Sequence, residues 1–525
     1  MTFWYWYVLA AAALSFSGYI TLNILLALLL AALVHVQFHF LASKKRVLTG
    51  LKAAVTAAAA LALLWRESFL PPASTLVSFL ANPATRPSTE YIVQFIRQSI
   101  NFQMLAAAIV LFAAVYLVYR KKPFQLALSV YFILGLAWIM QPKQSIADLG
   151  AATPEAFYKK ESSRVLEFPQ PSNNAPPFDV IILHICSLSW MDIKDSGSDI
   201  IPFFSKFDYV FTNFNSATGY SKIAAMHVLR SPCGQVPAPQ FFTGAGAGCY
   251  LMDDLRKDGY KTYTIFSHDG KYDDFIGEVQ KYGHADAPLG IAGLPVKYHM
   301  FDGTALYADN AALDKFWKAR QASGAPRAAL YYNTVNLHIG THKANGSRGR
   351  DEAADYKERL AEMTKEMEEF FSEVESSGRN AVVIFVPEHG AALTGTKMQA
   401  KDVREIPLPP IVVVPAAVRL IGKGFYADRK PQVITKPASL QALAWLIAEF
   451  LKNDPYTKEA RKPETVASEI PATDFLAENY NSAVMKAGFG YIYKIKGGNW
   501  TPLPAYAGIF PDTIPSPEDF ARAAR

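Results

Sequence analysis

The chain has 525 residues, which is more than a single hydrophobic core usually organises, so we expect at least two domains. Apolar residues make up 51% of the sequence and the formal net charge is +6, but neither is evenly distributed. Residues 1–143 contain eleven basic and two acidic side chains, so the rest of the chain is mildly acidic. A basic surface for nucleic acid would have to lie in that acidic part, and the charge distribution therefore argues against nucleic-acid binding.

The first 142 residues predict a bundle of five transmembrane helices, because a helix needs about 20 apolar residues to cross a bilayer core. The candidate spans are residues 3–18, 20–41, 47–65, 103–119 and 124–140. Five spans place the basic runs Lys44–Arg46 and Arg120–Lys122 on the same side, which the positive-inside rule makes cytoplasmic. We therefore expect a cytoplasmic N-terminus and place everything after about residue 142 outside.

Two of these spans have alternative interpretations. Residues 1–18 could be a cleaved signal peptide, but they lack a positively charged start and the apolar sequence continues beyond them. Residues 53–65 could form a re-entrant or interfacial helix. Losing that span would place the two basic runs on opposite sides of the membrane, which is why we keep it.

The sequence after the helices predicts an α/β domain over residues 179–505. Residues 143–178, which end in a Pro/Asn/Ser stretch, predict a linker, and residues 506–525 predict a loosely ordered tail. Residues 351–378 predict the clearest helix, whose acidic side is most simply a solvated face. The strand candidates are 179–186, 260–266, 328–335, 380–386 and 410–415. Continuous apolar runs that alternate with helices predict a largely parallel central sheet.

Three of these strands end in residues that bind metals. Cys186 ends the first, Glu388 and His389 end the fourth, and His338 and His342 follow the third. A thiolate, a carboxylate and imidazoles form a donor set that Zn²⁺ favours. Cys186 taken alone would more often be a small buried hydrophobe, and Gly340 between the two histidines argues against a zinc-binding helix there.

Ser221 is the candidate nucleophile, because the sequence after it predicts a short helix. At a helix N-terminus, free backbone N–H groups can hold a phosphoryl oxygen, and metal coordination would lower the pKa of the hydroxyl. Ser221 could also be only the N-cap of that helix. Cys233 and Cys249 flank a Gly/Pro-rich loop and indicate a disulfide in an exported domain, which leaves Cys186 free to be a ligand.

Five segments, in unbroken order, resemble the phosphoethanolamine transferase subunit of bacterial cellulose secretion systems, a family of the alkaline phosphatase and sulfatase superfamily. The segments are ICSLSW (185–190), NFNSATGYS (213–221), SPCGQ (231–235), CYLMDDL (249–255) and VPEHG (386–390). The resemblance covers about residues 175–500, and the N-terminal part matches in architecture more than in residues. Gly219 and the KIAA after Ser221 depart from the family pattern, which has a serine before the tyrosine and Gly-Pro after the nucleophile.

The resemblance implies transfer of phosphoethanolamine from phosphatidylethanolamine to glucose hydroxyls of nascent cellulose, through a covalent intermediate on Ser221. It implies one Zn²⁺ held by Cys186, Ser221, Glu388 and His389. It also gives roles to His338, which would assist the leaving or attacking oxygen, and to Tyr220 and Arg404, which would line the phosphate pocket. Cys233 and Cys249 match the disulfide pair of the family.

The same resemblance implies a multi-pass protein of the bacterial inner membrane. Its alkaline-phosphatase-like domain would lie in the periplasm, and its partner would be the cellulose synthase complex. Two other functions remain open. One is transfer of phosphoethanolamine or glycerol phosphate to lipid A or to another envelope glycan. The other is a non-catalytic membrane scaffold of the secretion complex, in which the metal would be structural.

Overall fold

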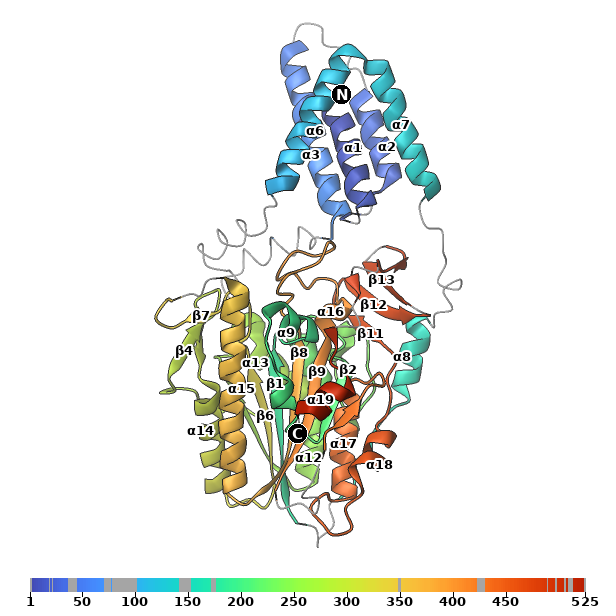
Figure 1. The fold of residues 1–525 in the computed structure, drawn as a ribbon. Coiled ribbons are helices and arrows are strands. Elements are labelled where there is room, and N and C mark those ends of the chain that lie inside the picture. Colours follow the sequence, from blue (N-terminus) through green and yellow to red (C-terminus); the bar gives the residue numbers. More distant parts are fainter. Residues whose placement is uncertain are drawn as a thin grey trace. The chain divides into compact units, whose positions relative to one another are not determined.

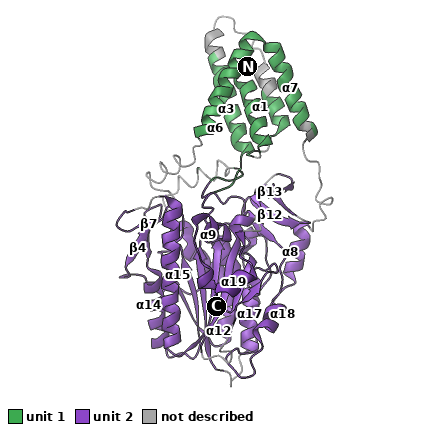
Figure 2. Cartoon of the chain, in the orientation of Figure 1, with its two compact units in different colours: residues 1–79, 92–145, 395–400 green, residues 80–91, 146–394, 401–525 purple. Residues whose placement is uncertain are grey.

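The computed structural model describes most of the chain in two compact units (Figure 2). The described residues are 2–17, 19–20, 22–35, 45–69, 77, 102–140, 153–170, 176–347, 351–422, 430–488, 490–495, 498–504, 507–508 and 513–523. The helical unit comprises residues 1–79, 92–145 and 395–400, and the α/β unit comprises residues 80–91, 146–394 and 401–525.

The helical unit contains helices close to the predicted spans. They are α1 (Thr2–Phe16), α2 (Ile24–His35), α3 (Lys45–Glu67), α6 (Phe102–Lys121) and α7 (Pro123–Met140). They pack around an apolar core that includes Trp4 and Tyr7. Among the described helices, α6 alone is long and apolar enough to cross a membrane, whereas α1 and the first part of α7 are apolar but shorter. Residues 36–41 of the predicted second span lie outside the described residues.

The α/β unit is built on a mixed sheet of seven described strands in the order β10-β2-β9-β8-β1-β6-β3 (Figure 1). The strands are β1 (Phe178–Cys186), β2 (Tyr209–Asn215), β3 (Lys261–Phe266), β6 (Ala328–Thr334), β8 (Asn380–His389), β9 (Val413–Ile421) and β10 (Gln432–Ile434). Of these strands β9 alone runs antiparallel to its neighbours, so the prediction of a largely parallel sheet is confirmed. The middle strands are buried on both faces, which explains their continuous apolar sequences.

Helices cover both faces of this sheet (Figure 1). Alternate residues such as Ile182 and Ile384 share one core with α11 (Ser221–Leu229), α12 (Leu251–Lys257), α13 (Phe275–Gly283) and α17 (Leu440–Lys452). On the other face Phe385 packs on Phe203 and Phe204. That face also carries α9 (Trp190–Ser196), α10 (Ile201–Phe204), α14 (Asp309–Ala322) and α15 (Glu352–Ser376). The alternation follows from the two-residue period of a strand, and α15 confirms the predicted helix 351–378.

Shorter elements complete the unit. One smaller sheet contains β11 (Leu476–Glu478), β12 (Ser482–Ala487), β13 (Gly490–Ile495) and β14 (Thr501–Pro502). Another contains β5 (Ala305–Tyr307), β4 (Val296–His299) and β7 (His342–Lys343). The remaining helices are α8 (Pro154–Ser162), α16 (Pro409–Val412), α18 (Pro463–Glu469), α19 (Pro517–Ala523), and the 3-10 turns η3 (Ala238–Phe242), η4 (Ala247–Cys249) and η5 (Tyr272–Asp274).

The structure differs from the sequence-based expectation in three segments. The strand predicted at 410–415 is wrong in its first half, where Pro409 and Pro410 open α16, because proline cannot donate to a strand ladder. The predicted linker 143–178 contains α8, whose Tyr158 hydroxyl donates to Glu478 at 2.5 Å. The tail predicted to be loosely ordered contains α19, which buries Phe520.

Candidate metal centre and nucleophile

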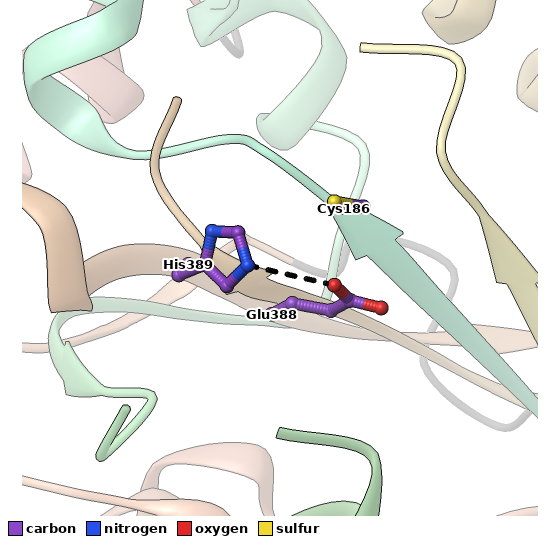
Figure 3. A group of neighbouring side chains, drawn as sticks. All are labelled: Cys186, Glu388 and His389. Atoms are coloured by element: carbon purple, nitrogen blue, oxygen red, sulfur yellow. Dashed lines mark ion pairs between the residues drawn. The ribbon is translucent and has the colours of Figure 1, made fainter. Parts of the chain in front are cut away.

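The carboxyl ends of β1 and β8 meet because these neighbouring strands are parallel. Cys186 pairs with His389, and the register shifts between Ile185 and Cys186. The shift leaves Glu388 as an extra residue opposite β1. A bulge of this kind breaks the strict alternation of a strand, so two consecutive side chains can approach the same site. Figure 3 shows Glu388 and His389 side by side, with Cys186 at the end of the neighbouring strand.

Cys186, Glu388 and His389 form a group whose candidate ligand atoms all lie within 4.8 Å of one another, and all three residues are buried. The Nε2 atom of His389 is 3.7 Å from Oε2 of Glu388. The hydroxyl of Ser221 joins the group, 3.3 Å from Nε2 of His389 and 3.7 Å from Sγ of Cys186. The four residues of the predicted metal site therefore lie together in the structure.

The spacing and chemistry of these donors fit a tetrahedral metal ion. Tetrahedral Zn²⁺ with bonds of about 2.0–2.3 Å holds its ligand atoms about 3.3–3.8 Å apart. The distances of 3.3, 3.7 and 3.7 Å lie in this interval. In addition, Oε2 of Glu388 is buried and has no hydrogen-bond partner among the described residues. A buried carboxylate oxygen without a donor is costly unless a cation binds it.

Burial sets the protonation of this group. It raises the pKa of the Cys186 thiol, with a further contribution from Glu388, and it raises the pKa of the Glu388 carboxyl. It lowers the pKa of His389, as does the charge of Arg404. Without a cation, burial therefore shifts the thiol and the carboxyl toward their protonated forms. A divalent cation reverses this preference, because it binds the thiolate, the carboxylate and the neutral imidazole.

Ser221 is the first residue of α11. Tyr220 is the N-cap, and its side chain makes no capping hydrogen bond, so no N-cap side chain occupies the N–H groups of the first turn. Gly219 passes close to the Arg404 backbone, where a Cβ atom would lie 2.9 Å from the Arg404 carbonyl oxygen. The glycine that departs from the family pattern therefore permits this close approach.

Three further predicted site residues lie beside the group. An N–H of Arg404 lies 3.3 Å from Nε2 of His338, whose Nδ1 lies 2.8 Å from the Ile339 carbonyl oxygen. Burial and the charge of Arg404 lower the pKa of His338, so its imidazole is neutral near pH 7. The hydroxyl of Tyr220 donates to Glu405. His342 does not join the group, because it lies in β7 and pairs with His299 of β4.

Sequence reasoning missed three residues that support the candidate ligands. Asn333 of β6 donates to Oε1 of Glu388 at 2.6 Å, and His184 of β1 lies 3.8 Å from the same oxygen. Burial lowers the pKa of His184 to about 3, so it is neutral. Asp192 of α9 accepts the N–H groups of Ala391 and Leu393, just after the ligands of β8. Polar residues in apolar strands, such as His184 and Asn333, were the available signal.

As expected, two of the three cysteines form a disulfide and the third is a free thiol. Cys233 and Cys249 form a disulfide, and Cys186 is free and buried. The disulfide joins the end of α11 to the start of α12 and lies apart from the metal ligands in sequence. It leaves Cys186 as the thiol available to a metal.

The fold and the site together define a class of protein, namely an apolar helical unit followed by an α/β domain in which a partly buried serine joins a buried Cys/Glu/His group. Comparison with protein families gives the particular family. The N-terminal domain model of the cellulose biosynthesis protein BcsG matches residues 4–141, and its C-terminal domain model matches residues 140–500. The chain belongs to the BcsG family, which confirms the resemblance drawn from the five segments at the level of the family.

Two BcsG proteins agree with this assignment. The chain is 31% identical over 549 residues to the cellulose biosynthesis protein BcsG of Escherichia coli K12, covering 95% of this chain and 96% of that protein. The BcsG protein of Salmonella typhimurium LT2 is likewise 31% identical over 546 residues, with the same coverage. Among solved structures, a protein of the alkaline phosphatase superfamily from Vibrio parahaemolyticus is 14% identical, with a TM-score of 0.46 over 72% of this chain and 96% of that chain.

Proposed function

We propose that this chain is a zinc-dependent phosphotransferase that moves phosphoethanolamine from phosphatidylethanolamine to glucose hydroxyls of cellulose. The observation that carries the proposal is the position of the Ser221 hydroxyl, 3.3 Å from His389 and 3.7 Å from Cys186 at a helix N-terminus. A structural metal site would have no need of a serine at that point. Membership of a cellulose biosynthesis family supports the acceptor, and the resemblance of the five motifs supports the donor.

In the first step, Oγ of Ser221 attacks the phosphorus of the lipid phosphodiester. The bond from Oγ to phosphorus forms, the bond from phosphorus to the diacylglycerol oxygen breaks, and that oxygen takes up the serine proton. In the second step, a glucose hydroxyl attacks the same phosphorus and displaces Oγ, and the proton of the hydroxyl returns to the serine. The chain is therefore regenerated with no net change.

Charge neutralisation and positioning dominate phosphoryl transfer. Cys186, Glu388, His389 and Ser221 would hold one Zn²⁺, which supplies a Lewis acid and lowers the pKa of the serine hydroxyl. The free N–H groups at the start of α11 would hold phosphoryl oxygens. Arg404 supplies a fixed positive charge beside the site, and Asp402, 3.0 Å away, holds it in place.

His338 is the residue that we assign to proton movement. Its imidazole is neutral because burial and Arg404 lower its pKa, and Nε2, which faces an Arg404 N–H at 3.3 Å, is the ring atom that would accept the proton of the attacking hydroxyl. Tyr220 lies beside the nucleophile, and its hydrogen bond to Glu405 helps to hold the segment that leads into α11. Both assignments place these residues beside the reacting group and give them no covalent step.

We further propose that the helical unit anchors the protein in the bacterial inner membrane by five spans, with the α/β domain in the periplasm. The apolar helix α6 supports a membrane anchor, and five spans would put both basic runs on one side, as the positive-inside rule requires. A membrane anchor would give the domain access to a lipid donor, and the cellulose synthase complex is the partner that would deliver the polymer.

The test is a search for the covalent intermediate. The full chain is purified in detergent, loaded with Zn²⁺ and incubated with phosphatidylethanolamine, and peptides containing residue 221 are examined by mass spectrometry. We expect a phosphoethanolamine adduct on Ser221 that Ser221→Ala abolishes. The control Ser205→Ala, which replaces the serine at the C-terminal end of α10, should leave the adduct intact. A chain with no adduct that still supports cellulose modification in cells would instead be a scaffold.

A further inference from the structure

We propose that three aromatic rings beside Ser221 form the surface on which the glucose rings of the acceptor polymer pack. The aromatic border, as we name it, consists of Tyr220, Tyr480 and Phe242. This inference rests on the proposed function, which it deepens by giving the acceptor a binding surface. It also selects a neutral glycan over a phosphorylated lipid as the acceptor class.

The three rings come from distant segments but lie next to one another. Tyr220 immediately precedes Ser221, Tyr480 follows β11, and Phe242 ends η3. The ring centroids of Tyr220 and Tyr480 are 5.8 Å apart with an angle of 29° between planes. Those of Tyr480 and Phe242 are 6.1 Å apart with an angle of 33°. The first pair is stacked and the second is tilted, so the three rings form one continuous aromatic group.

The border is accessible to solvent. Tyr480 is 45% exposed, which is unusual for a large aromatic side chain in this unit. Tyr220 and Phe242 are half-buried at the edge of the main core. Tyr480 is not an isolated exposed residue, because its ring contacts Tyr220 and Phe242, and a contiguous group of rings beside the nucleophile is a candidate ligand surface.

The border continues around the site through a second set of contacts. Lys222, which follows Ser221, lies over the Phe242 ring and pairs with Asp273 at 2.9 Å. Next to Asp273, the Tyr272 ring contacts Phe301 with centroids 5.8 Å apart. Phe301 in turn lies 5.2 Å from the ring of His338. Both residues that flank Ser221 therefore begin a series of contacts. Tyr220 leads to the other rings of the aromatic border, and Lys222 leads through Asp273 and its neighbours toward His338.

The chemistry of this surface suits a neutral polymer of sugar rings. Aromatic faces pack against the C–H faces of pyranose rings, and amphipathic tyrosine also offers a hydroxyl. The positively charged side chains near this surface are already paired, Lys222 with Asp273 and Arg404 with Asp402. Burial raises the pKa of the Tyr480 hydroxyl, and the Glu278 carboxylate lies close enough to raise it further, so Glu278 adds a negative charge to this surface. The phosphates of a lipid A acceptor would meet that charge, which disfavours them.

The direct test measures binding and transfer separately. Binding of cellohexaose is measured by titration calorimetry on the full chain carrying Ser221→Ala, so that no reaction occurs. Transfer to the same oligosaccharide is measured on the otherwise unchanged chain. We expect Tyr480→Ala and Phe242→Ala each to weaken binding and raise KM about ten-fold, the effect of about 1.4 kcal/mol. Tyr480→Phe keeps the ring and should stay within about two-fold.

Tyr491→Ala is the matched control, because Tyr491 is a partly exposed tyrosine whose ring packs on Phe475 and lies outside the border. It should leave binding unchanged. Equal binding by Tyr480→Ala and the control would overturn the inference. So would a loss of Ser221 adduct formation in Tyr480→Ala, because that result would assign the ring to the ammonium group of the donor. If the unsubstituted chain bound cellohexaose through Tyr480 but formed no adduct, the proposed function would fail while this surface stood.

Discussion

Asp192 gives the sharpest test of how the candidate centre is held. Its wholly buried carboxylate lies between the turn after Cys186 and the turn after His389. One oxygen accepts the Ser189 N–H at 3.0 Å, the Ser189 hydroxyl at 2.7 Å and the Ala391 N–H at 2.8 Å. The other oxygen accepts the Leu393 N–H at 3.2 Å. Replacing Asp192 by alanine removes the acceptor of four donors.

The magnitude follows from that count. Each buried donor left without a partner costs about 1–3 kcal/mol, and the serine hydroxyl can rotate to another acceptor. We therefore expect Asp192→Ala to destabilise this region by about 4 kcal/mol. Asp192→Asn can keep its carbonyl oxygen toward the three donors of the first oxygen, but its amide then faces the Leu393 N–H. Losing that single bond should cost about 2 kcal/mol.

Hydrogen–deuterium exchange of the peptide covering residues 386–394, together with the bound metal content, reports the effect, because exchange measures the free energy of local opening. Asp195→Ala is the control: Asp195 lies in the same helix and accepts a hydrogen bond from Thr394, but that bond is exposed. It should change the opening free energy by less than about 0.5 kcal/mol. Equal exchange in Asp192→Asn and Asp192→Ala, or wild-type exchange in both, would refute the reasoning.

Two further predictions concern protonation and metal binding. Burial and the Glu366 carboxylate raise the pKa of Asp309 from 3.8 to about 6. The protonated carboxyl therefore stabilises the folded state fully below pH 3.8, and this contribution to the free energy of unfolding is lost as the pH rises through 6. Asp309→Asn should therefore gain up to about 3 kcal/mol relative to the unsubstituted chain between pH 4 and 7, and parallel pH profiles of the thermal midpoint would contradict this. Cys186→Ala, Glu388→Ala and His389→Ala should each lose zinc by elemental analysis, whereas His342→Ala should retain it. Stoichiometric zinc in all three ligand variants would rule out this site.

The extent of prediction differed between elements. The apolar runs at β1, β3, β6 and β8 predicted these strands closely, because a strand buried on both faces must be continuously apolar. The strand β2 was not predicted, since its sequence mixes Thr and Asn with aromatic residues. The docking of α8 was missed because it depends on partners such as Glu478 that are distant in the chain. Local composition does not carry that information.

In the candidate site, too, some residues could be predicted from the sequence and others could not. The residue types at strand ends, and the serine before a short helix, identified Cys186, Ser221, Glu388 and His389 from the sequence. The supporting residues Asn333 and Asp192 were not predicted, because each acts on a strand end that is distant in sequence. The aromatic border was also not predicted, since Tyr480 meets Tyr220 across 260 residues of chain.

The sequence by itself determined the donor chemistry, the main strands and the unequal distribution of apolar residues. Only the tertiary structure decided that β1 and β8 are neighbours, and that a register shift at Glu388 brings two consecutive residues toward Cys186. The physical reason is that donor chemistry and strand propensity are properties of local sequence. Strand order and register depend instead on how the whole sheet packs between its helices.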